Sequence, residues 1–435
     1  MHTVIHWFRR DLRISDNTAL HEAWNRSQCL VPVFIWDDAI LQAPDVGPAR
    51  VAFLLRSLEA LARNLEALGH RLIILHGTPA TELARLATQV QAAAVFTNRD
   101  YEPYAIQRDR AVAAELYRAG IHFESFKDSV VWEGREILNQ SGEPYTVFTP
   151  YSKAWRTRAL PPLVPRVGRA RIPVDASIPS LPLPADSGAL DHPLQQTLPE
   201  AGEHAAQAIQ RLFLQGSVLD YADQRNFPAR DSGTSRLSPH LRFGTINIRT
   251  VLHRLRQMAA DTHSPKAAQS LQTWETELIW REFYIQILAN FPHVASRCFR
   301  PEYDRIDWPG TDALFDAWRE GQTGYPIVDA AMRCLKATGW MHNRLRMITA
   351  MFLVKDLLVS WQQGERHFMR LLVDGDLAAN NGGWQWSAGT GTDAAPYFRI
   401  FNPVSQGEKF DPEGTFVRRW VPELSELGPD QIHQP

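Results

Sequence analysis

The 435-residue sequence has few cysteines and no long apolar run. Its three cysteines, Cys29, Cys298 and Cys334, lie far apart and form no C-x-x-C pair. This spacing argues against a disulfide scaffold or a thiolate metal site and is typical of a reducing compartment. No apolar stretch approaches the roughly 20 residues of a membrane-spanning helix, and Arg9 and Arg10 follow a very short apolar run. We expect a cytoplasmic protein that has no membrane span and needs no metal.

The sequence also has little net charge. It contains 46 basic and 48 acidic residues, which gives a formal charge of −2 at pH 7. Any affinity for nucleic acid must therefore come from a local basic patch, because the field of the whole molecule is close to neutral. Charge alone neither indicates nor excludes DNA as a partner.

The first 130 residues alternate short apolar runs with amphipathic patterns. The apolar runs predict strands at 4–8, 30–36, 71–77, 92–98 and 122–126, with helices at 49–69 and 105–120. This βαβ series predicts a doubly wound parallel sheet of the Rossmann type. The segment FRRDLRISDN stands after the first strand, where a dinucleotide-binding protein would have G-x-G-x-x-G, so ordinary NAD binding is not expected.

The second half of the chain has a different pattern. Prolines recur between positions 160 and 200, which predicts an extended connector. Helical periodicity then covers 205–224, 245–261, 270–291, 325–339, 343–375 and 416–428, without strand patterns. We expect an α/β domain at 1–132, a connector at 133–200 and an all-helical domain at 201–435, since the length suits two cores.

Six segments resemble motifs of the photolyase and cryptochrome family. They are WFRRDLRISDN (7–17), TSRLSPHLRFG (234–244), WETELIWREFY (274–284), TGYPIVDAAMR (323–333), GWMHNRLRM (339–347) and DGDLAANNGGWQWSAGTGTDAAPYFRIFNP (374–403). The motifs are long, and the resemblance covers nearly the whole chain. Within the family the chain is most similar to the class I cyclobutane pyrimidine dimer photolyases. The resemblance implies an α/β domain that binds an antenna chromophore and a helical domain that holds FAD in a bent form.

The resemblance implies a set of FAD-binding residues. Asn380 would face the reactive ring nitrogen of the flavin, where a neutral amide can donate or accept a hydrogen bond. The hydroxyl-rich TSRLS segment suits a pyrophosphate at a helix N-terminus. The implied cofactor-binding residues are Tyr221, Thr234, Ser235, Arg236, Leu237, Ser238, Trp274, Arg281, Asn343, Asp374, Asp376 and Asn380.

The residues alone leave structural alternatives open for each of these motifs. DGD…NN can be an acidic turn followed by a helix N-cap, and TSRLS can be a simple capping segment. Glu277 and Arg281 can form an ion pair at i, i+4 on one helix, because residues four apart share a face. HNRLRM can be a solvated basic helix face.

UV-damaged DNA, double- or single-stranded, is the partner that the resemblance implies. Glu277 would hydrogen-bond a thymine of the dimer, Trp280 and Trp386 would stack on the flipped bases, Asn343 and Met347 would lie beside them, and Arg344 would meet a backbone phosphate. The (6-4) photolyases carry histidines at the positions of Asn343 and Met347. The residues found here therefore favour the cyclobutane dimer as substrate.

The 14 tryptophans, most of them in the second half of the chain, are an excess that the resemblance explains in part. The family passes an electron from the surface to oxidised flavin through three indoles, which correspond to Trp384, Trp361 and Trp308. From the residues alone, each would be ordinary core. The implied repair mechanism is light-driven: excited reduced FAD gives an electron to the dimer, the ring opens and the electron returns. Glu277 and Asn380 join the three indoles as the implied catalytic residues.

The antenna site departs from the folate-binding pattern of the family. Tyr104 and Ala105 stand where photolyases with methenyltetrahydrofolate have asparagine and glutamate. GPARVAFL (47–54) together with RDYEPY (99–104) resembles the photolyases that use 8-hydroxy-5-deazaflavin. The implied lining residues are Trp36, Arg50, Asp100 and Glu102. A flavin in the same cleft, or an empty cleft, is the alternative.

Two further functions compete with repair. A cryptochrome-type blue-light photoreceptor would share the fold and FAD, but signalling cryptochromes often carry a long tail, and this chain stops at Pro435, fifteen residues after Trp420. A light-independent nucleotide-binding protein would explain the first domain only. The family precedent leads us to expect a monomer.

Overall fold

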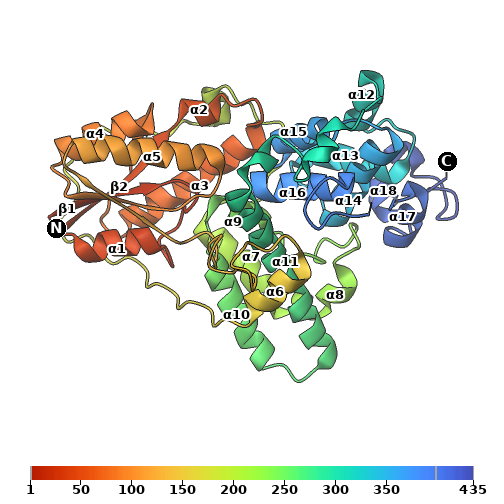
Figure 1. Cartoon of the computed structure of the whole chain (residues 1–435), viewed down its shortest axis with the longest axis horizontal. Helices are drawn as coiled ribbons and strands as arrows, with labels where there is room; N and C mark the ends of the chain where they lie inside the picture. The colour runs from red at the N-terminus through yellow and green to blue at the C-terminus, as the bar shows by residue number, and fades with distance from the viewer. Residues whose placement is uncertain (1, 397–398, 435) are drawn as a thin grey trace.

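The structure is a computed structural model of the chain, and it describes residues 2–396 and 399–434. A sheet with flanking helices lies at one end of the molecule, and a larger group of helices forms the other end (Figure 1). This arrangement confirms the predicted fold class. Within the described residues, no helix combines the length and the apolar character needed to cross a bilayer.

The sheet contains all five predicted strands. They are β1 (Thr3–Phe8), β2 (Cys29–Trp36), β3 (Ile73–His76), β4 (Ala94–Asn98) and β5 (His122–Phe126). The strands are parallel in the order β3-β2-β1-β4-β5. Every residue of the central strands β1, β2 and β4 is buried, which explains their continuous apolar runs.

Helices cover both faces of the sheet. One core joins α1 (Thr18–Arg26) and α3 (Pro48–Glu66) to one face, and a second joins α4 (Pro79–Gln89) and α5 (Pro103–Arg118) to the other. Short α2 (Asp38–Leu41) follows β2. The strand order reverses between β1 and β4, and in such sheets a ligand crevice opens beyond the carboxyl ends of the strands at this point.

The proline-rich segment runs along the α/β end of the molecule. Its backbone amides donate to carbonyls of that region, including Ala170 N to Leu68 O at 2.8 Å and Leu181 N to Ile74 O at 2.9 Å. Helix α6 (Phe148–Arg156), which was not predicted from the sequence, precedes this extended stretch.

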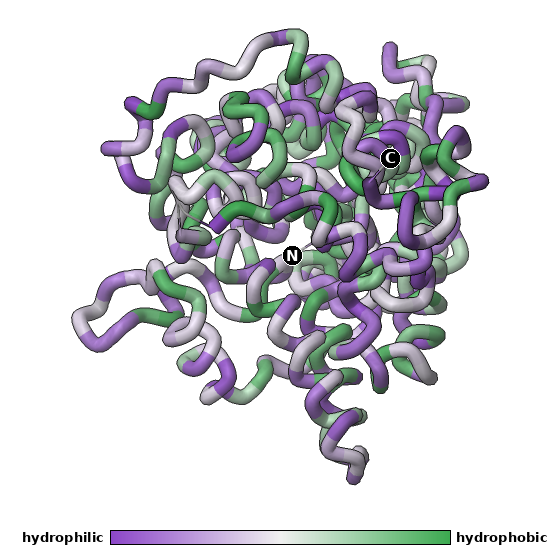
Figure 2. Tube along the Cα trace, turned by 90° about the vertical axis from the view of Figure 1, so that its right-hand side faces the viewer, coloured by the Kyte–Doolittle hydropathy of each residue, from purple (hydrophilic) through white to green (hydrophobic). Residues whose placement is uncertain are grey.

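The remaining helices enclose two hydrophobic cores. They are α7 (Glu203–Gln215), α8 (Tyr221–Gln224), α9 (Ser238–Phe243), α10 (Ile248–Ala260), α11 (Pro265–Asn290), α12 (Asp312–Glu320), α13 (Pro326–Thr338), α14 (Asn343–Met351), α15 (Trp361–Leu371), α16 (Leu377–Ala388), α17 (Pro403–Phe410) and α18 (Thr415–Trp420). One core surrounds α11, and the other lies among α13, α14, α15 and α16. Hydrophilic and hydrophobic residues alternate along the outer helices, as amphipathic packing requires (Figure 2).

The helical pattern at 343–375 is interrupted in the structure. After α14 the chain forms a π-helical turn at Phe352–Asp356, and Leu358 then adopts a left-handed backbone with φ of 53°. Ser360 caps the new helix α15 by accepting from the amide of Gln362. The sequence did not reveal this break because the buried apolar residues continue across it, including Val354 and Val359.

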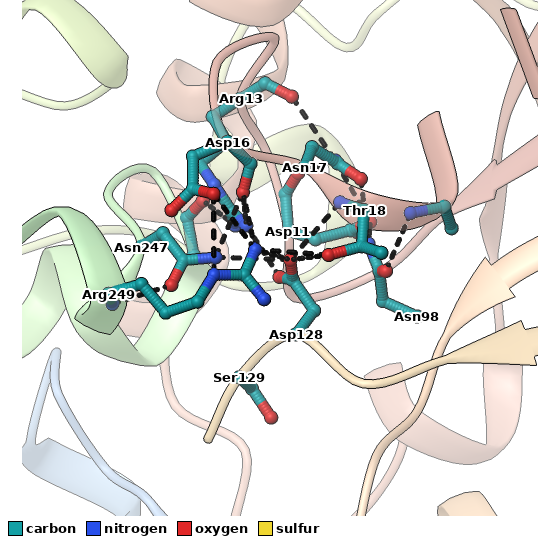
Figure 3. Close-up of polar contacts among 12 residues, drawn as sticks. Asp11, Arg13, Asp16, Asn17, Thr18, Asn98, Asp128, Ser129, Asn247 and Arg249 are labelled. Atoms are coloured by element: carbon teal, nitrogen blue, oxygen red, sulfur yellow. Dashed lines mark hydrogen bonds and ion pairs between the residues drawn. The ribbon is translucent and has the colours of Figure 1, made fainter. Parts of the chain in front are cut away.

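A buried charge network joins the two ends of the molecule (Figure 3). Arg249 of α10 pairs with Asp16 at 2.9 Å and with Asp128 at 3.4 Å. Asp128 also accepts a hydrogen bond from Arg13 at 2.6 Å. Asn247, the N-cap of α10, donates to the backbone oxygen of Asp16 at 2.9 Å. The segment that replaces a phosphate-binding loop after β1 therefore anchors the sheet region to the helices.

Candidate active site

Helix α16 presents most of the residues of the DGDLAANN motif. Asp376 caps its N-terminus by accepting from Ala379 N at 3.1 Å, and its other oxygen pairs with Arg10. Burial opposes the charge on Asp376, but Arg10, Arg242 and Arg281 outweigh it and hold the pKa of this carboxyl well below its usual range. The carboxylate is therefore a fixed negative charge at the start of α16.

Asp374 is held from the neighbouring helix. Arg346 of α14 donates to its Oδ2 atom at 2.7 Å, and the side chain is 3% exposed. In the part of the chain that the structure describes, its Oδ1 atom is buried without a hydrogen-bond partner. Buried carboxylate oxygens rarely lack a donor, so Oδ1 has capacity to accept from a bound group.

The side-chain amide of Asn380 is oriented by Glu365 of α15. Its Nδ2 atom donates to the backbone oxygen of Glu365 at 3.0 Å and to Oε1 at 3.1 Å. These contacts occupy the donor end of the amide, so its carbonyl oxygen is the end left for another donor. Burial raises the pKa of Glu365 to about 7, while the hydrogen bond from Asn380 opposes that rise.

The TSRLS segment forms a tight turn before α9. Arg236 has a left-handed backbone with φ of 51°, and Leu237 follows in the right-handed helical region. Successive residues of opposite hand form an anion-binding concavity of backbone amides. Trp340 supports this turn: its Nε1 atom lies 3.3 Å from Ser238 Oγ, and Arg236 stacks over its ring at 4.7 Å. Leu237 itself is a core side chain, at 1% exposed.

Helix α11 carries three of the residues implied by the resemblance, Trp274, Glu277 and Arg281. Trp274 is buried in the core that also includes Tyr221, whereas Glu277 and Arg281 are half-buried. The alternative i, i+4 pair between Glu277 and Arg281 does not form. Glu277 instead pairs with Arg225 at 2.7 Å, and Arg281 donates to the backbone oxygen of Ser129 at 2.9 Å.

Arg344 of the HNRLRM segment lies next to the Glu277–Arg225 ion pair. Arg344 donates to Asn226 Oδ1 at 2.7 Å and stacks over the ring of Phe410 at 4.5 Å. Since Asn226 follows Arg225 in the chain, these contacts connect α14 to Glu277 of α11. Asn343 is exposed and Met347 is half-buried one turn later on α14.

The two tryptophans predicted to stack on a lesion are both half-buried. Trp280 of α11 stacks face to face on Phe148, with ring centroids 3.6 Å apart and planes at 5°. Trp386 of α16 accepts a hydrogen bond at its backbone oxygen from Ala395 N at 3.2 Å. Helix α16 packs against both α11 and α14, so the polar and aromatic residues of the three helices share one region.

The three relay tryptophans belong to one hydrophobic core. Trp384 and Trp361 are fully buried, and Trp308 is half-buried at its edge. Gly364 of α15 lies directly against the Trp384 ring, where a side chain would overlap it. Gly310 N donates to Leu358 O at 3.0 Å, which attaches the Trp308 segment to the chain entering α15.

A cavity of about 390 Å³ opens at the carboxyl ends of the strands. Trp36, Arg50, Asp100 and Glu102, the four residues expected at an antenna site, all line it, together with Tyr104. Tyr104 donates to Asp37 Oδ2 at 2.5 Å across the wall. Arg10 lies between this cavity and α16, since it contacts Glu102 at 2.6 Å and pairs with Asp376.

Five side chains that contact the predicted site residues were not predicted from the sequence. They are Arg10, Phe148, Arg225, Arg346 and Glu365. Arg10 and Arg346 stand in quoted motifs and Glu365 lies in the helical pattern at 343–375, but nothing local distinguishes a partner from a surface charge. Phe148 lies in a region that the sequence analysis assigned to the connector.

Comparisons with known proteins agree across the chain. The model of the DNA photolyase family matches residues 4–168, and that of the FAD binding domain of DNA photolyase matches residues 274–435. A deoxyribodipyrimidine photo-lyase of Synechococcus sp. is 44% identical over 99% of this chain and 90% of its own length.

Two solved structures have the same fold. An archaeal photolyase from Sulfolobus tokodaii, described with two FAD molecules, has a TM-score of 0.86 and 34% identity and covers 99% of this chain and 92% of its own. A cryptochrome of Synechocystis sp. has a TM-score of 0.91 and 28% identity, with coverage of 100% and 92%. The fold and the matched domains define a two-part flavoprotein. The chain belongs to the photolyase and cryptochrome family.

Proposed function

We propose that this chain is a light-dependent DNA repair enzyme that opens cyclobutane pyrimidine dimers. The observation that carries this proposal is the gathering of Trp280, Glu277, Arg344 and Trp386 on α11, α14 and α16, of which α16 also carries the DGDLAANN motif. Full-length relatives named deoxyribodipyrimidine photo-lyase support it. UV-damaged DNA is the proposed substrate.

The residues present fit FAD. The amide concavity at Arg236 suits its pyrophosphate. Asp374 Oδ1 and Asn380 Oδ1, which have no hydrogen-bond partner among the described residues, suit the polar edge of the isoalloxazine. When bound and reduced, the cofactor supplies the photochemistry, a one-electron transfer to the dimer and back. Tyr221, Thr234, Ser235, Ser238, Trp274, Arg281, Asn343 and Asp376 complete the proposed contacts.

The protein's own task at the flavin is to fix charge and hydrogen bonding. Glu365 holds the Asn380 amide so that its oxygen accepts from a protonated ring nitrogen. Arg10 keeps Asp376 ionised, which supplies a constant field beside the ring. These groups are already held by their own contacts, so they would need little reorganisation when charge moves.

The lesion pocket binds the dimer outside the DNA helix. Extruding a nucleotide costs a few kcal/mol, and least for a lesion that is already poorly stacked. Each aromatic stack, on Trp280 or Trp386, returns about 1–3 kcal/mol. Glu277 uses one oxygen on Arg225 and has a second for a thymine imide, while Arg344 neutralises a phosphate.

Trp384, Trp361 and Trp308 form the proposed relay that reduces oxidised flavin in light. Their shared core runs from α16 to the half-buried Trp308, which is the step to solvent. Trp318 contacts Trp384 edge-on at 6.0 Å but is fully buried, so it offers no exit to the surface.

The strand-end cavity is the proposed antenna site, and 8-hydroxy-5-deazaflavin is the proposed chromophore. Its volume suits a planar tricyclic ligand. The buried Arg50 and Trp36 each have a ring or guanidinium N–H without a partner among the described residues, which favours a ligand with carbonyl acceptors. The archaeal photolyase with two FAD molecules makes a second flavin the competing occupant. Protein made in a host that synthesises deazaflavin should carry a second chromophore, whereas stoichiometric folate would contradict this assignment.

Binding assays on two variants test the lesion pocket. Arg344→Ala should weaken binding to damaged and undamaged DNA alike and flatten the salt dependence, because it removes a phosphate contact. Trp386→Ala should cost about 1–3 kcal/mol on dimer-containing DNA with little change on undamaged DNA. Equal losses on both DNAs for Trp386→Ala would contradict a stacking role.

A cryptochrome-type photoreceptor is the second candidate, favoured by the close fold match to a Synechocystis cryptochrome. It predicts bound, photoactive FAD without dimer repair. The combination of Glu277, Trp280, Asn343, Met347 and Trp386 favours repair.

A further inference from the structure

Phe148, which precedes the proline-rich segment and belongs to the core around α11, supports one wall of the proposed lesion pocket. It is the first residue of α6, and its ring lies parallel to the indole of Trp280 at 3.6 Å between centroids. Phe283 meets both rings edge-on, at 5.7 Å from Phe148 and 5.5 Å from Trp280. Phe148 is 7% exposed, so this stack is part of the packed interior and fixes the plane of the indole.

One loop connects this stack to the second tryptophan of the pocket. Asp393 Oδ2 accepts from the backbone amide of Phe148 at 3.1 Å, and Thr392 Oγ1 donates to the backbone oxygen of Thr146. Two residues later, Ala395 N donates to the backbone oxygen of Trp386 at 3.2 Å. The loop at 392–395 therefore contacts both the support of Trp280 and the backbone that carries Trp386.

The conformation of this loop is specific. Asp393 has a left-handed backbone with φ of 46°, a region that residues other than glycine adopt at a cost. The carboxylate of Asp393 caps the first turn of α6 by accepting from the amide of Phe148. The N-cap residue of α6, Val147, has no side-chain acceptor of its own. The strained residue is thus held where it can fasten α6 to α16.

We propose that Phe148 and Asp393 are positioning residues that set the orientation and spacing of Trp280 and Trp386. They form a brace, defined as the Phe148–Trp280 stack together with the loop at 392–395. The inference rests on the proposed lesion pocket and goes beyond it by assigning lesion discrimination to residues that need not touch the DNA. Because the two indoles are already ordered, binding of a dimer loses less conformational entropy and is therefore tighter.

The experiment measures dissociation constants of FAD-loaded protein for dimer-containing and undamaged DNA of one sequence. Phe148→Leu keeps an apolar side chain but removes the aromatic stack, so we expect about two- to tenfold weaker binding to damaged DNA. Binding to undamaged DNA and FAD content should not change. Phe148→Tyr should restore the wild-type ratio of the two dissociation constants, because it restores the aromatic ring that stacks on Trp280. Phe315→Leu is the matched control, since Phe315 stacks on Trp318 in the other core.

Asp393→Ala tests the same brace without altering the core. It should weaken binding to damaged DNA relative to undamaged DNA, as Phe148→Leu does. This test holds even if Phe148→Leu fails to fold. A Phe148→Leu change in a Trp280→Ala background should have no further effect, because the Phe148 ring acts through that indole.

The outcomes separate the inference from the proposed function. If Trp280→Ala leaves discrimination unchanged, the lesion pocket itself is wrong. If Trp280→Ala weakens damaged-DNA binding while Phe148→Leu and Asp393→Ala bind as wild type, the pocket stands and the brace is overturned. A loss that Phe148→Tyr fails to restore would also contradict the brace.

Discussion

The buried carboxyl of Glu365 should make the free energy of unfolding depend on pH. Burial raises its pKa from 4.5 to about 7, a difference worth about 3 kcal/mol in the free energy of unfolding. The folded state keeps this proton between pH 4.5 and 7, whereas the unfolded chain releases it. The stabilisation is therefore complete below pH 4.5 and is lost as the pH rises towards 7.

Glu365→Gln removes this dependence, because glutamine is a permanent neutral analogue that can still accept from Asn380. About 2–3 kcal/mol of the effect falls between pH 5 and pH 8. The unfolding free energy of the variant relative to wild type should rise by this amount across that interval. Chemical denaturation of both FAD-loaded proteins at several pH values gives the difference directly.

The comparison cancels other titrating groups. Glu282, whose pKa burial also raises to about 7, contributes the same slope to both proteins. Glu66→Gln is the control, since that side chain is exposed and the change should leave the slope as in wild type. If the unfolding free energies of wild type and Glu365→Gln change in parallel with pH, the reasoning is refuted. Parallel changes would show that Glu365 carries no proton in the folded state at these pH values.

Three further predictions address the network, the relay and the antenna. Arg249→Ala should lower the unfolding free energy by about 3–5 kcal/mol, because it leaves Asp16 buried with its ion pair removed, and denaturant titration measures the loss. Trp384→Phe should block photoreduction of oxidised FAD but leave repair by chemically reduced enzyme largely intact, while Trp318→Phe beside it should photoreduce normally; unchanged photoreduction in Trp384→Phe would remove it from the relay. Arg50→Ala should lose the antenna chromophore and keep FAD, as absorption spectra will show; retention of both chromophores would exclude Arg50 from the site.

The sequence predicted the sheet well because buried parallel strands carry dense apolar runs. All five strands were found within a few residues of their ends. Helix α6 was missed because FTPYSKAWR is short, contains a proline and lies near the proline-rich segment. Helix α4 was missed although PATELARLATQ has a clear apolar face, so its pattern was available.

The partners of the site could not be predicted, since they depend on contacts between distant parts of the chain. Arg10 and Asp376 are 366 positions apart, and no local pattern relates them. The helices that carry the motifs do pack together, since α16 contacts both α11 and α14, and the roles of the motif residues stay predictions. The hydrogen bonds that orient them, such as Asn380 to Glu365, follow only from the structure.

Illumination of the reduced, FAD-loaded protein with defined lesions tests the central claim most directly. One substrate carries a thymine cyclobutane dimer and the other a (6-4) photoproduct in the same sequence, and repair is measured as restored thymines. The account predicts repair of the cyclobutane dimer only, because Asn343 and Met347 stand where a (6-4) enzyme needs histidines. Repair of neither lesion by protein whose FAD is bound and photoactive would contradict the account and favour the photoreceptor.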